Sequence, residues 1–250
     1  MIHHSKPLLG KEEEEAAVRV IRSGQLAQGV ECAALESDLA AYLSVDRVVV
    51  VSSGSAALHL ALVTMGKQSG GRIGIPSYVC SALLNAIRHI DGQPHLFDLP
   101  NGGFNINLKN VDRDLDAIIV PHMFGQAVSG LDEPSCLVIE DCAMSIGASA
   151  GSRKLGTLGT LGVFSFYATK VLCAGEGGAI CTDDAGLAEH VRDIRDYDGR
   201  TDSVTRYNYK MTEIQAAIAR VQLRSLDTFV SIRREIANRY TEALRDHPVA

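Results

Sequence analysis

The sequence predicts an α/β fold in which a mainly parallel sheet lies between layers of helices. Short runs rich in β-branched residues alternate with amphipathic stretches along most of the chain, a pattern typical of a parallel sheet covered by helices. The chain has 250 residues, of which 46% are hydrophobic and 22% charged, so it can bury a sizeable core. We therefore expect one large α/β domain.

The expected elements follow one another along the chain. A first helix is predicted from Lys11 to Arg22, because an acidic opening suits a helix N-terminus and Ser23-Gly24 ends the apolar periodicity. Strands are expected at the short apolar runs 47–52, 72–76, 94–98, 116–121, 136–140, 161–166 and 178–182. Further helices are expected between these strands, at about 55–65, 81–89 and 186–198.

The last part of the chain is predicted to be helical. From Thr212 the apolar positions have helical spacing, and a second long helix is expected from about Ser225 to the end. A helix that ends at 248–250 with nothing to pack against suggests a shortened version of a longer protein. We expect residues 1–225 to form the large domain, and residues 226–250 to begin the helix that leads into a truncated small domain.

Charge and hydropathy give no indication of nucleic acid or a membrane as a partner. The net charge of −6 gives no electrostatic reason to expect nucleic acid or an anionic membrane. Apolar runs such as 48–51 and 117–120 are far shorter than the roughly 20 residues that cross a bilayer. Residues 1–6 lack a hydrophobic signal core, which favours the cytoplasm.

Cysteine and histidine positions do not indicate a metal site. The six cysteines form no C-x-x-C pair, and several lie in apolar runs where a thiol behaves as a small hydrophobic group. His3 and His4 belong to the chain terminus, and no other group of His, Cys and carboxylate residues has ligand spacing. We expect buried, reduced thiols and no bound metal.

A turn rich in small residues follows the first expected strand. Residues 52–55 read Ser-Ser-Gly-Ser and lead directly into a helix. Free backbone N–H groups and hydroxyls at a helix start can bind an anion such as phosphate. A plain N-cap without a ligand would have the same residues.

Two acidic residues, Glu140 and Asp141, end another expected strand. Ligands of open α/β sheets bind at the carboxyl ends of the strands. A carboxylate at Asp141 could bond a protonated pyridine nitrogen and so keep a cofactor ring electron-withdrawing. The alternative is a solvated loop acid or a helix cap.

Lys170 is the lysine that the pattern singles out. It follows an aromatic-rich strand at 161–166 and precedes the glycine cluster 175–178, so partial burial is expected. Burial favours the neutral, nucleophilic form of an amine, which Schiff-base chemistry requires. The glycines would let the main chain turn back close to a bound ring. A surface lysine is the alternative.

Four segments together resemble a known family. Residues 53–62, 140–148, 164–178 and 207–217 are similar, in this order, to the motifs of the DegT/StrS sugar aminotransferases, which have the fold type I architecture of enzymes dependent on pyridoxal 5′-phosphate (PLP). The resemblance implies transfer of an amino group, from glutamate, to a keto group of a nucleotide-linked sugar. Relatives that remove a sugar hydroxyl usually have His in place of the lysine, so Lys170 favours amino transfer.

The resemblance also implies roles for individual residues. Lys170 would carry PLP as a Schiff base and move protons, and Asp141 would pair with the pyridine nitrogen. The phosphate would be held by Ser55, by the main chain at Ala56 and by Ser165. Asn208 would reach the phosphate of the neighbouring subunit in a homodimer with shared active sites.

Two positions depart from the family pattern. Cys80 stands where the family usually has an aromatic residue stacked on the ring, with Tyr78 nearby, and Met144 stands where it usually has Gln or His. A catalytically impaired or regulatory PLP-binding fragment is therefore an alternative function. A nicotinamide dinucleotide domain is disfavoured, because the glycines at 156, 159 and 162 lack the G-x-G-x-x-G spacing.

Overall fold

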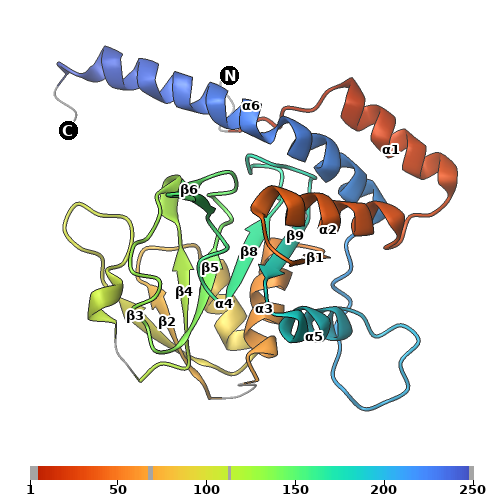
Figure 1. Cartoon of the computed structure of the whole chain (residues 1–250), viewed down its shortest axis with the longest axis horizontal. Helices are drawn as coiled ribbons and strands as arrows, with labels where there is room; N and C mark the ends of the chain where they lie inside the picture. Colours follow the sequence, from red (N-terminus) through yellow and green to blue (C-terminus); the bar gives the residue numbers. More distant parts are fainter. Residues whose placement is uncertain (1–4, 67–69, 112–113, 248–250) are drawn as a thin grey trace.

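The computed structural model describes residues 5–66, 70–111 and 114–247, which form a layered α/β fold. A central sheet has helices α3, α4 and α5 on one face and α2 and α6 on the other (Figure 1). The predicted fold class, a mainly parallel sheet between helices, is confirmed. His3 and His4 lie outside the described residues.

Seven strands form the main sheet in the described part of the chain. Strand β9 is antiparallel to both of its neighbours, and the other adjacent strands pair in parallel. Each strand lies within one residue of its predicted bounds. In spatial order they are β1 Arg47–Val51, β9 Gly178–Thr182, β8 Leu161–Ser165, β5 Leu137–Asp141, β4 Ala117–Pro121, β2 Arg72–Pro76 and β3 Gln93–Phe97.

Most helices also lie close to their predicted positions. Short 3-10 turns occur at Leu108–Asn110 and Met123–Gly125, and a small hairpin joins β6 Ser149–Ala150 to β7 Arg153–Lys154. The helices are α1 Lys11–Ser23, α2 Val30–Leu43, α3 Gly54–Thr64, α4 Ser81–His89, α5 Ala185–Arg195 and α6 Glu213–Leu244.

Two helical predictions are corrected by the structure. Helix α2 was not expected, and α6 is one continuous helix where two helices meeting near Ser225 were expected. The stretch 213–244 contains no Gly or Pro that would break a helix, and Leu226 is fully buried on the same face as Leu223. The proposed domain division at residue 225 thus falls inside a helix, and it stays a prediction.

A buried carboxylate joins the starts of α2 and α6. Glu213, at the start of α6, accepts hydrogen bonds from the N–H groups of Gly29 (2.8 Å), Glu31 (2.8 Å) and Cys32 (2.9 Å). These N–H groups open α2 and have no partner within their own helix. The negative charge at the positive end of the helix dipole therefore holds α2 against α6.

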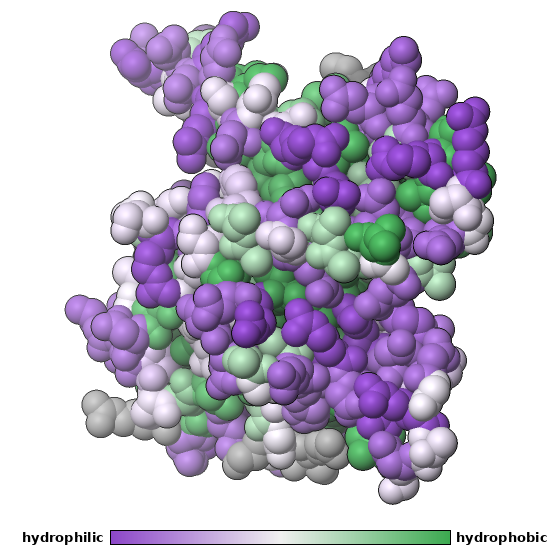
Figure 2. Space-filling view, turned by 45° about the vertical axis from the view of Figure 1, so that its right-hand side comes forward, coloured by the Kyte–Doolittle hydropathy of each residue, from purple (hydrophilic) through white to green (hydrophobic). Residues whose placement is uncertain are grey.

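The core has one apolar layer on each face of the sheet. In β1, Val49 and Val51 pack among α3, α4 and α5, whereas Val48 and Val50 pack against α2 and α6. This alternation follows from the two-residue period of a strand. On the outside, hydrophilic side chains cover most of the face in Figure 2, and hydrophobic ones gather in a band across its middle. Among the described helices, none is both long and apolar enough to cross a membrane.

Candidate active site

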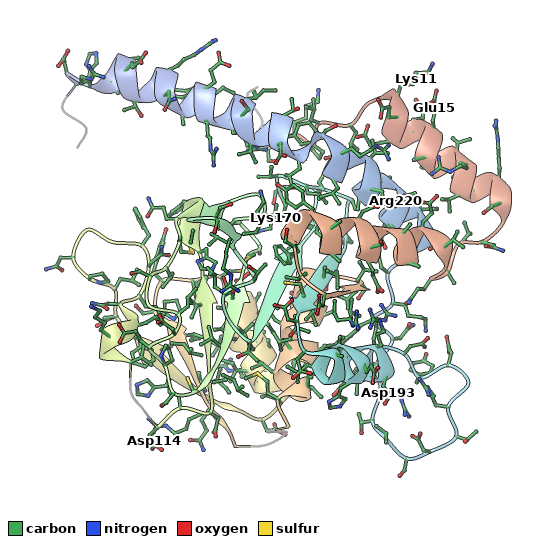
Figure 3. All side chains as sticks on the ribbon, in the orientation of Figure 1. Lys11, Glu15, Asp114, Lys170, Asp193 and Arg220 are labelled. Carbon is green, nitrogen blue, oxygen red and sulfur yellow. The ribbon has the colours of Figure 1, made fainter. Side chains whose placement is uncertain are left out.

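A cavity of about 580 Å³ lies at the carboxyl ends of β4, β5 and β8. Its lining includes Asp141 and Lys170. Lys170 lies at the end of the sheet opposite Asp114, which precedes β4 (Figure 3). The carboxyl ends of parallel strands meet at one edge of a sheet, so residues distant in sequence converge there.

Lys170 is held in a turn between two paired segments. The N–H of Phe166 donates to the carbonyl oxygen of Gly177 (2.8 Å), and the N–H of Ala168 donates to that of Gly175 (3.0 Å). Lys170 lies inside the loop that these bonds close, and it is half-buried. The predicted partial burial is confirmed, whereas its role as the cofactor lysine stays a prediction.

Glycines bring the start of α3 against β8 and β9. A Cβ atom at Gly54 would lie 2.7 Å from Cβ of Ser165, and one at Gly178 would lie 2.7 Å from the carbonyl carbon of Ser53. Only a residue without a side chain allows such close approaches. The result is that Ser55 and Ser165 line the same cavity although they are far apart in sequence.

The serine-rich turn caps α3 and presents a hydroxyl to the cavity. The Ser53 hydroxyl accepts a hydrogen bond from the N–H of Ala56 (3.1 Å), which is the N-cap arrangement. Ser55, in the first helical turn, is exposed in the cavity wall. Ala56 is buried beside the cavity and its N–H is engaged by Ser53, so its main-chain contact to a phosphate stays a prediction.

Asp141 is a buried carboxyl group in the cavity wall. Its Oδ1 accepts a hydrogen bond from the N–H of Ala143 (3.0 Å). Burial raises the pKa of Asp141 above its ordinary value, and the Ala143 hydrogen bond and the charge of Lys170 offset part of that rise. A cationic partner would stabilise the ionised form of this group.

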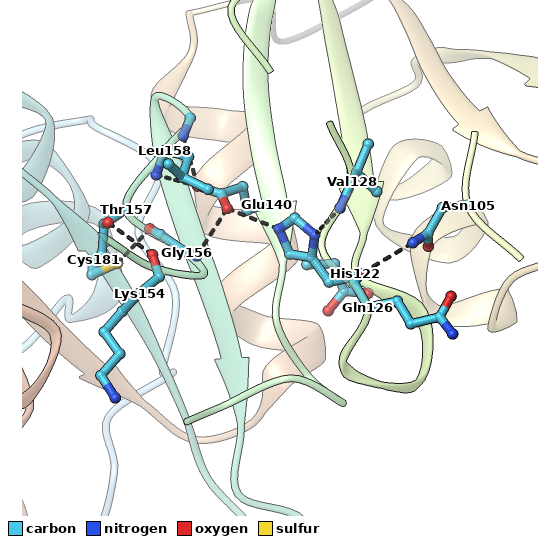
Figure 4. Close-up of polar contacts among 12 residues, drawn as sticks. Asn105, His122, Gln126, Val128, Glu140, Lys154, Gly156, Thr157, Leu158 and Cys181 are labelled. Carbon is cyan, nitrogen blue, oxygen red and sulfur yellow. Dashed lines mark hydrogen bonds and ion pairs between the residues drawn. The ribbon is translucent and has the colours of Figure 1, made fainter. Parts of the chain in front are cut away.

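Glu140, the preceding residue, is fully buried on the other side of β5. It accepts hydrogen bonds from the N–H groups of Gly156 (2.9 Å), Leu158 (2.6 Å) and Gly159 (2.6 Å), and from Nε2 of His122 (2.8 Å) (Figure 4). Burial alone would raise the pKa of Glu140, but these hydrogen bonds hold it below its ordinary value.

His122 links β4 to this carboxylate. Its Nδ1 accepts a hydrogen bond from the N–H of Val128 (3.1 Å), so a neutral ring carries its proton on Nε2 and donates it to Glu140. The ring is buried and also lines the cavity. Sequence analysis missed His122; the available signal was its place directly after the buried strand 117–121.

Cys142 completes a buried group that resembles a metal site in composition. Potential ligand atoms of His122, Glu140 and Cys142 lie within 4.8 Å of one another, which sequence spacing did not indicate. Both nitrogens of His122 and both oxygens of Glu140 are already hydrogen-bonded. Burial raises the pKa of the Cys142 thiol well above its ordinary value, which disfavours the thiolate that a metal needs. The group is best explained as a hydrogen-bonded support for the cavity wall.

Asn208 lies outside the cavity of its own chain. The flanking N–H groups of Tyr207 and Tyr209 donate to the carbonyl oxygens of Ile194 (2.8 Å) and Arg195 (3.0 Å), and the two tyrosine rings stack with centroids 5.1 Å apart. Asn208, between them, is exposed. Its contact with the phosphate of a neighbouring subunit stays a prediction.

The positions that depart from the family pattern also line the cavity. Cys80 is exposed at the N-cap of α4, and Tyr78 lies beside it in the wall. Met144 is 45% exposed in the same cavity. These three residues therefore shape the wall of the cavity.

Comparison with known proteins identifies the family. Residues 7–250 match the DegT/DnrJ/EryC1/StrS aminotransferase family. The chain belongs to this family. GDP-perosamine synthase of Escherichia coli O157:H7 is 31% identical over 93% of the chain and 68% of that protein. The spore coat polysaccharide biosynthesis protein SpsC of Bacillus subtilis (strain 168) is 30% identical over 98% of the chain and 69% of that protein.

Solved structures show the same fold. The aminotransferase TlmJ from Streptoalloteichus hindustanus superposes with a TM-score of 0.93 at 30% identity, over 98% of the chain and 72% of that structure. Helicobacter pylori PseC, an aminotransferase involved in the biosynthesis of pseudoaminic acid, has a TM-score of 0.90 at 26% identity, over 98% of the chain and 71% of PseC. The predicted family, fold class and enzyme class are confirmed: the chain is an aminotransferase.

Proposed function

We propose that this DegT/DnrJ/EryC1/StrS family member uses PLP to move an amino group from glutamate to a keto group of a nucleotide-linked sugar. The observation that carries the proposal is one cavity that combines a lysine, a buried carboxylate and serines at a helix N-terminus. The relatives named GDP-perosamine synthase support a nucleotide-linked sugar as the substrate class.

The residues of the cavity fit PLP. Its phosphate needs hydroxyl donors at a helix start, and Ser55 and Ser165 are brought together there by the close approach at Gly54. Its pyridine nitrogen needs an anion, and the buried carboxyl of Asp141 lacks a cationic partner in direct contact among the described residues. Its aldehyde needs an amine, which Lys170 supplies.

The chain's own residues then have separate tasks. Bound PLP supplies an electron sink for negative charge on the amino-donor carbon. Asp141 holds a proton on the pyridine nitrogen electrostatically, and Lys170 binds the cofactor and moves protons through its Nζ atom. The buried His122–Glu140 pair holds the ends of β4 and β5 in place.

We further propose a homodimer in which Asn208 completes the phosphate site of the neighbouring subunit. Its exposure, on a segment fixed by the main-chain bonds of Tyr207 and Tyr209, supports this arrangement. We place the reaction in the cytoplasm, because all six cysteines are free thiols, as is usual in a reducing compartment.

The alternative function is a PLP-binding regulatory protein without turnover, which Cys80 and Met144 favour. The two functions are separated by incubating the PLP-loaded protein with glutamate alone. An aminotransferase forms one equivalent of 2-oxoglutarate per site and then returns to the PLP form when a nucleotide-linked keto sugar is added. Stable PLP binding with no 2-oxoglutarate would refute the proposed transfer and support the regulatory alternative.

A further inference from the structure

Three large aromatic side chains lie exposed together beyond the carboxyl ends of β2, β3 and β4. Tyr78, Phe104 and Phe124 are 54%, 45% and 55% exposed. The ring centroids of Tyr78 and Phe104 are 6.2 Å apart, and those of Phe104 and Phe124 are 5.0 Å apart. We call these three residues the aromatic cluster. Grouped exposed apolar side chains of this kind usually mark a binding surface.

The cluster is held in place by specific contacts. The Asn105 side chain joins the two loops that carry the phenylalanines: its Oδ1 accepts from the N–H of Met123 (3.1 Å), and its Nδ2 donates to the carbonyl oxygen of Gln126 (3.0 Å). Phe124 has φ of 55°, in the left-handed region that is unfavourable for a bulky residue. A strained and exposed phenylalanine gains nothing for the core, and such strain is concentrated at functional sites.

The cluster is continuous with the active-site cavity. Tyr78 lines the cavity and contacts Phe104, and Met123, the residue before Phe124, lines it as well. A molecule that places one end beside Lys170 can therefore extend outward onto the cluster without leaving the protein surface.

We propose that the aromatic cluster binds the base of the nucleotide attached to the keto sugar. This inference rests on the proposed function, which requires the sugar to reach Lys170 and leaves the base further out. Every nucleobase has an apolar planar face that stacks on aromatic side chains. The cluster thus supplies stacking affinity for the base, and the inner cavity is left for the sugar and PLP.

The direct test measures binding of free nucleoside diphosphates by calorimetry, with GDP, UDP and dTDP as probes and inorganic pyrophosphate as the ligand without a base. Phe124→Ala should weaken the tightest nucleotide roughly 5- to 150-fold, which corresponds to the loss of one stacking contact of about 1–3 kcal/mol. Pyrophosphate should bind the variant and the parent equally. Phe124→Tyr should restore nucleotide affinity.

The matched control is Tyr240→Ala, which removes a 66% exposed aromatic side chain from α6. It should leave nucleotide affinity unchanged. In turnover, Phe124→Ala should raise KM for the nucleotide-linked sugar far more than it lowers kcat, because uniform binding energy is lost. Far-UV circular dichroism checks that each variant is folded.

Several results would overturn the inference. The first is that Phe124→Ala and Phe104→Ala leave nucleotide affinity unchanged, and the second is that they weaken pyrophosphate binding as much as nucleotide binding. The third is that the parent protein binds no nucleotide. The fourth is that either variant converts a dimeric parent into monomers. The last result would make the cluster a subunit interface. The glutamate half-reaction of the parent needs no nucleotide, so its success alongside any of these results refutes this inference alone, and its failure refutes the proposed function.

Discussion

At the residue scale, Glu140 and Asp141 are adjacent carboxyl groups whose pKa values shift in opposite directions. Glu140 faces four hydrogen-bond donors, and its pKa is lowered. Asp141 faces the cavity with one backbone donor, and burial raises its pKa. The strand period places them on opposite sides of β5. Asp141 is therefore the carboxylate that gains most from a cationic ligand, and Glu140 is already satisfied.

Asp141→Asn should slow the glutamate half-reaction by at least roughly 100-fold, since a neutral amide cannot balance a protonated ring nitrogen. The free energy of unfolding, measured without PLP, should be nearly unchanged or higher in the variant. The raised pKa of Asp141 shows that burial disfavours its ionised carboxyl group, and the variant removes that group. Stopped-flow absorbance and urea unfolding measure the two effects. Half-reaction rates equal to those of the parent would show that Asp141 has another role.

Lys170→Ala should abolish covalent attachment of PLP and leave non-covalent binding through Asp141, Ser55 and Ser165. After borohydride reduction of the parent, mass spectrometry should find the pyridoxyl group on the peptide that contains Lys170. Lys154→Ala is a matched control outside the cavity lining and should retain the adduct. An adduct on another lysine would show that Lys170 is wrongly assigned.

The sequence predicted the site residues that pattern alone can place. Asp141 and Lys170 follow buried strands, and such positions meet at one edge of a parallel sheet, so their shared cavity was predictable. His122 and the hydrogen-bond partners of Glu140 were missed, because these contacts join residues such as His122 and Gly159 that lie 18 or 19 positions from Glu140 with no shared motif. The exposure of Asn208 does not reveal whether its side chain contacts the cofactor of its own chain or that of a neighbouring subunit.

At the element scale, local signals explain which helices the sequence could and could not indicate. The apolar spacing of α2 at Cys32, Leu35, Leu39 and Leu43 is regular, but alanines around the helix obscure its polar face. Its N-cap residue, Gly29, has no side chain that could cap the helix. The carboxylate that caps it belongs to Glu213, 184 residues away, so no local capping signal marks the start of α2. Most strands of the main sheet were easier to predict, since each is a short apolar run that is almost fully buried. The exception is β3, a largely exposed strand at the edge of the sheet.

Glu140 joins β5, the loop before β8 and His122 after β4, so Glu140→Gln should destabilise the protein. The Glu140 carboxylate accepts hydrogen bonds from four donors, whereas a glutamine amide has only one acceptor oxygen, so buried donors would lose their partner. We expect the free energy of unfolding at pH 7 to fall by about 3 kcal/mol. Glu242→Gln, at an exposed position of α6, should change it by less than about 0.5 kcal/mol. Urea unfolding measures both.

The pH dependence of this loss follows from the lowered pKa of Glu140. Its ordinary pKa is 4.5, and the folded value is lower, so the carboxylate contributes its full stability above pH 4.5. That contribution disappears as the pH falls through the folded pKa. The difference between parent and Glu140→Gln should therefore shrink below pH 4.5, and a constant difference would contradict the assigned hydrogen-bond role.

At the scale of the whole molecule, two features of the described chain are exposed to solvent. One is Asn208, on a segment that is itself held by main-chain bonds. The other is the outer half of α6, which extends past the sheet (Figure 1) and carries Ile232, Ile236, Tyr240 and Leu244, 47–66% exposed. These four side chains form an apolar stripe along one helix, spaced four residues apart. The fold class was predictable because alternating strands and helices admit few arrangements, whereas contacts between chains leave no periodic signal.

The proposed homodimer should have twice the 26.8 kDa mass of one chain by light scattering at tens of micromolar. Asn208→Ala should keep this mass and weaken PLP binding by roughly 10- to 100-fold, the effect of losing one hydrogen bond to a charged phosphate. Asn238→Ala, at an exposed position of α6, is the matched control and should bind PLP like the parent.

Mixing two defective variants tests whether the active sites are shared. In a heterodimer of Lys170→Ala and Asn208→Ala chains, a shared site places the intact Lys170 of one chain with the intact Asn208 of the other. One complete site per heterodimer is then restored, and the reduced pyridoxyl adduct should return on mixing at PLP concentrations too low to load Asn208→Ala alone. If Asn208 served its own chain, no heterodimer could contain a complete site, and mixing would restore nothing.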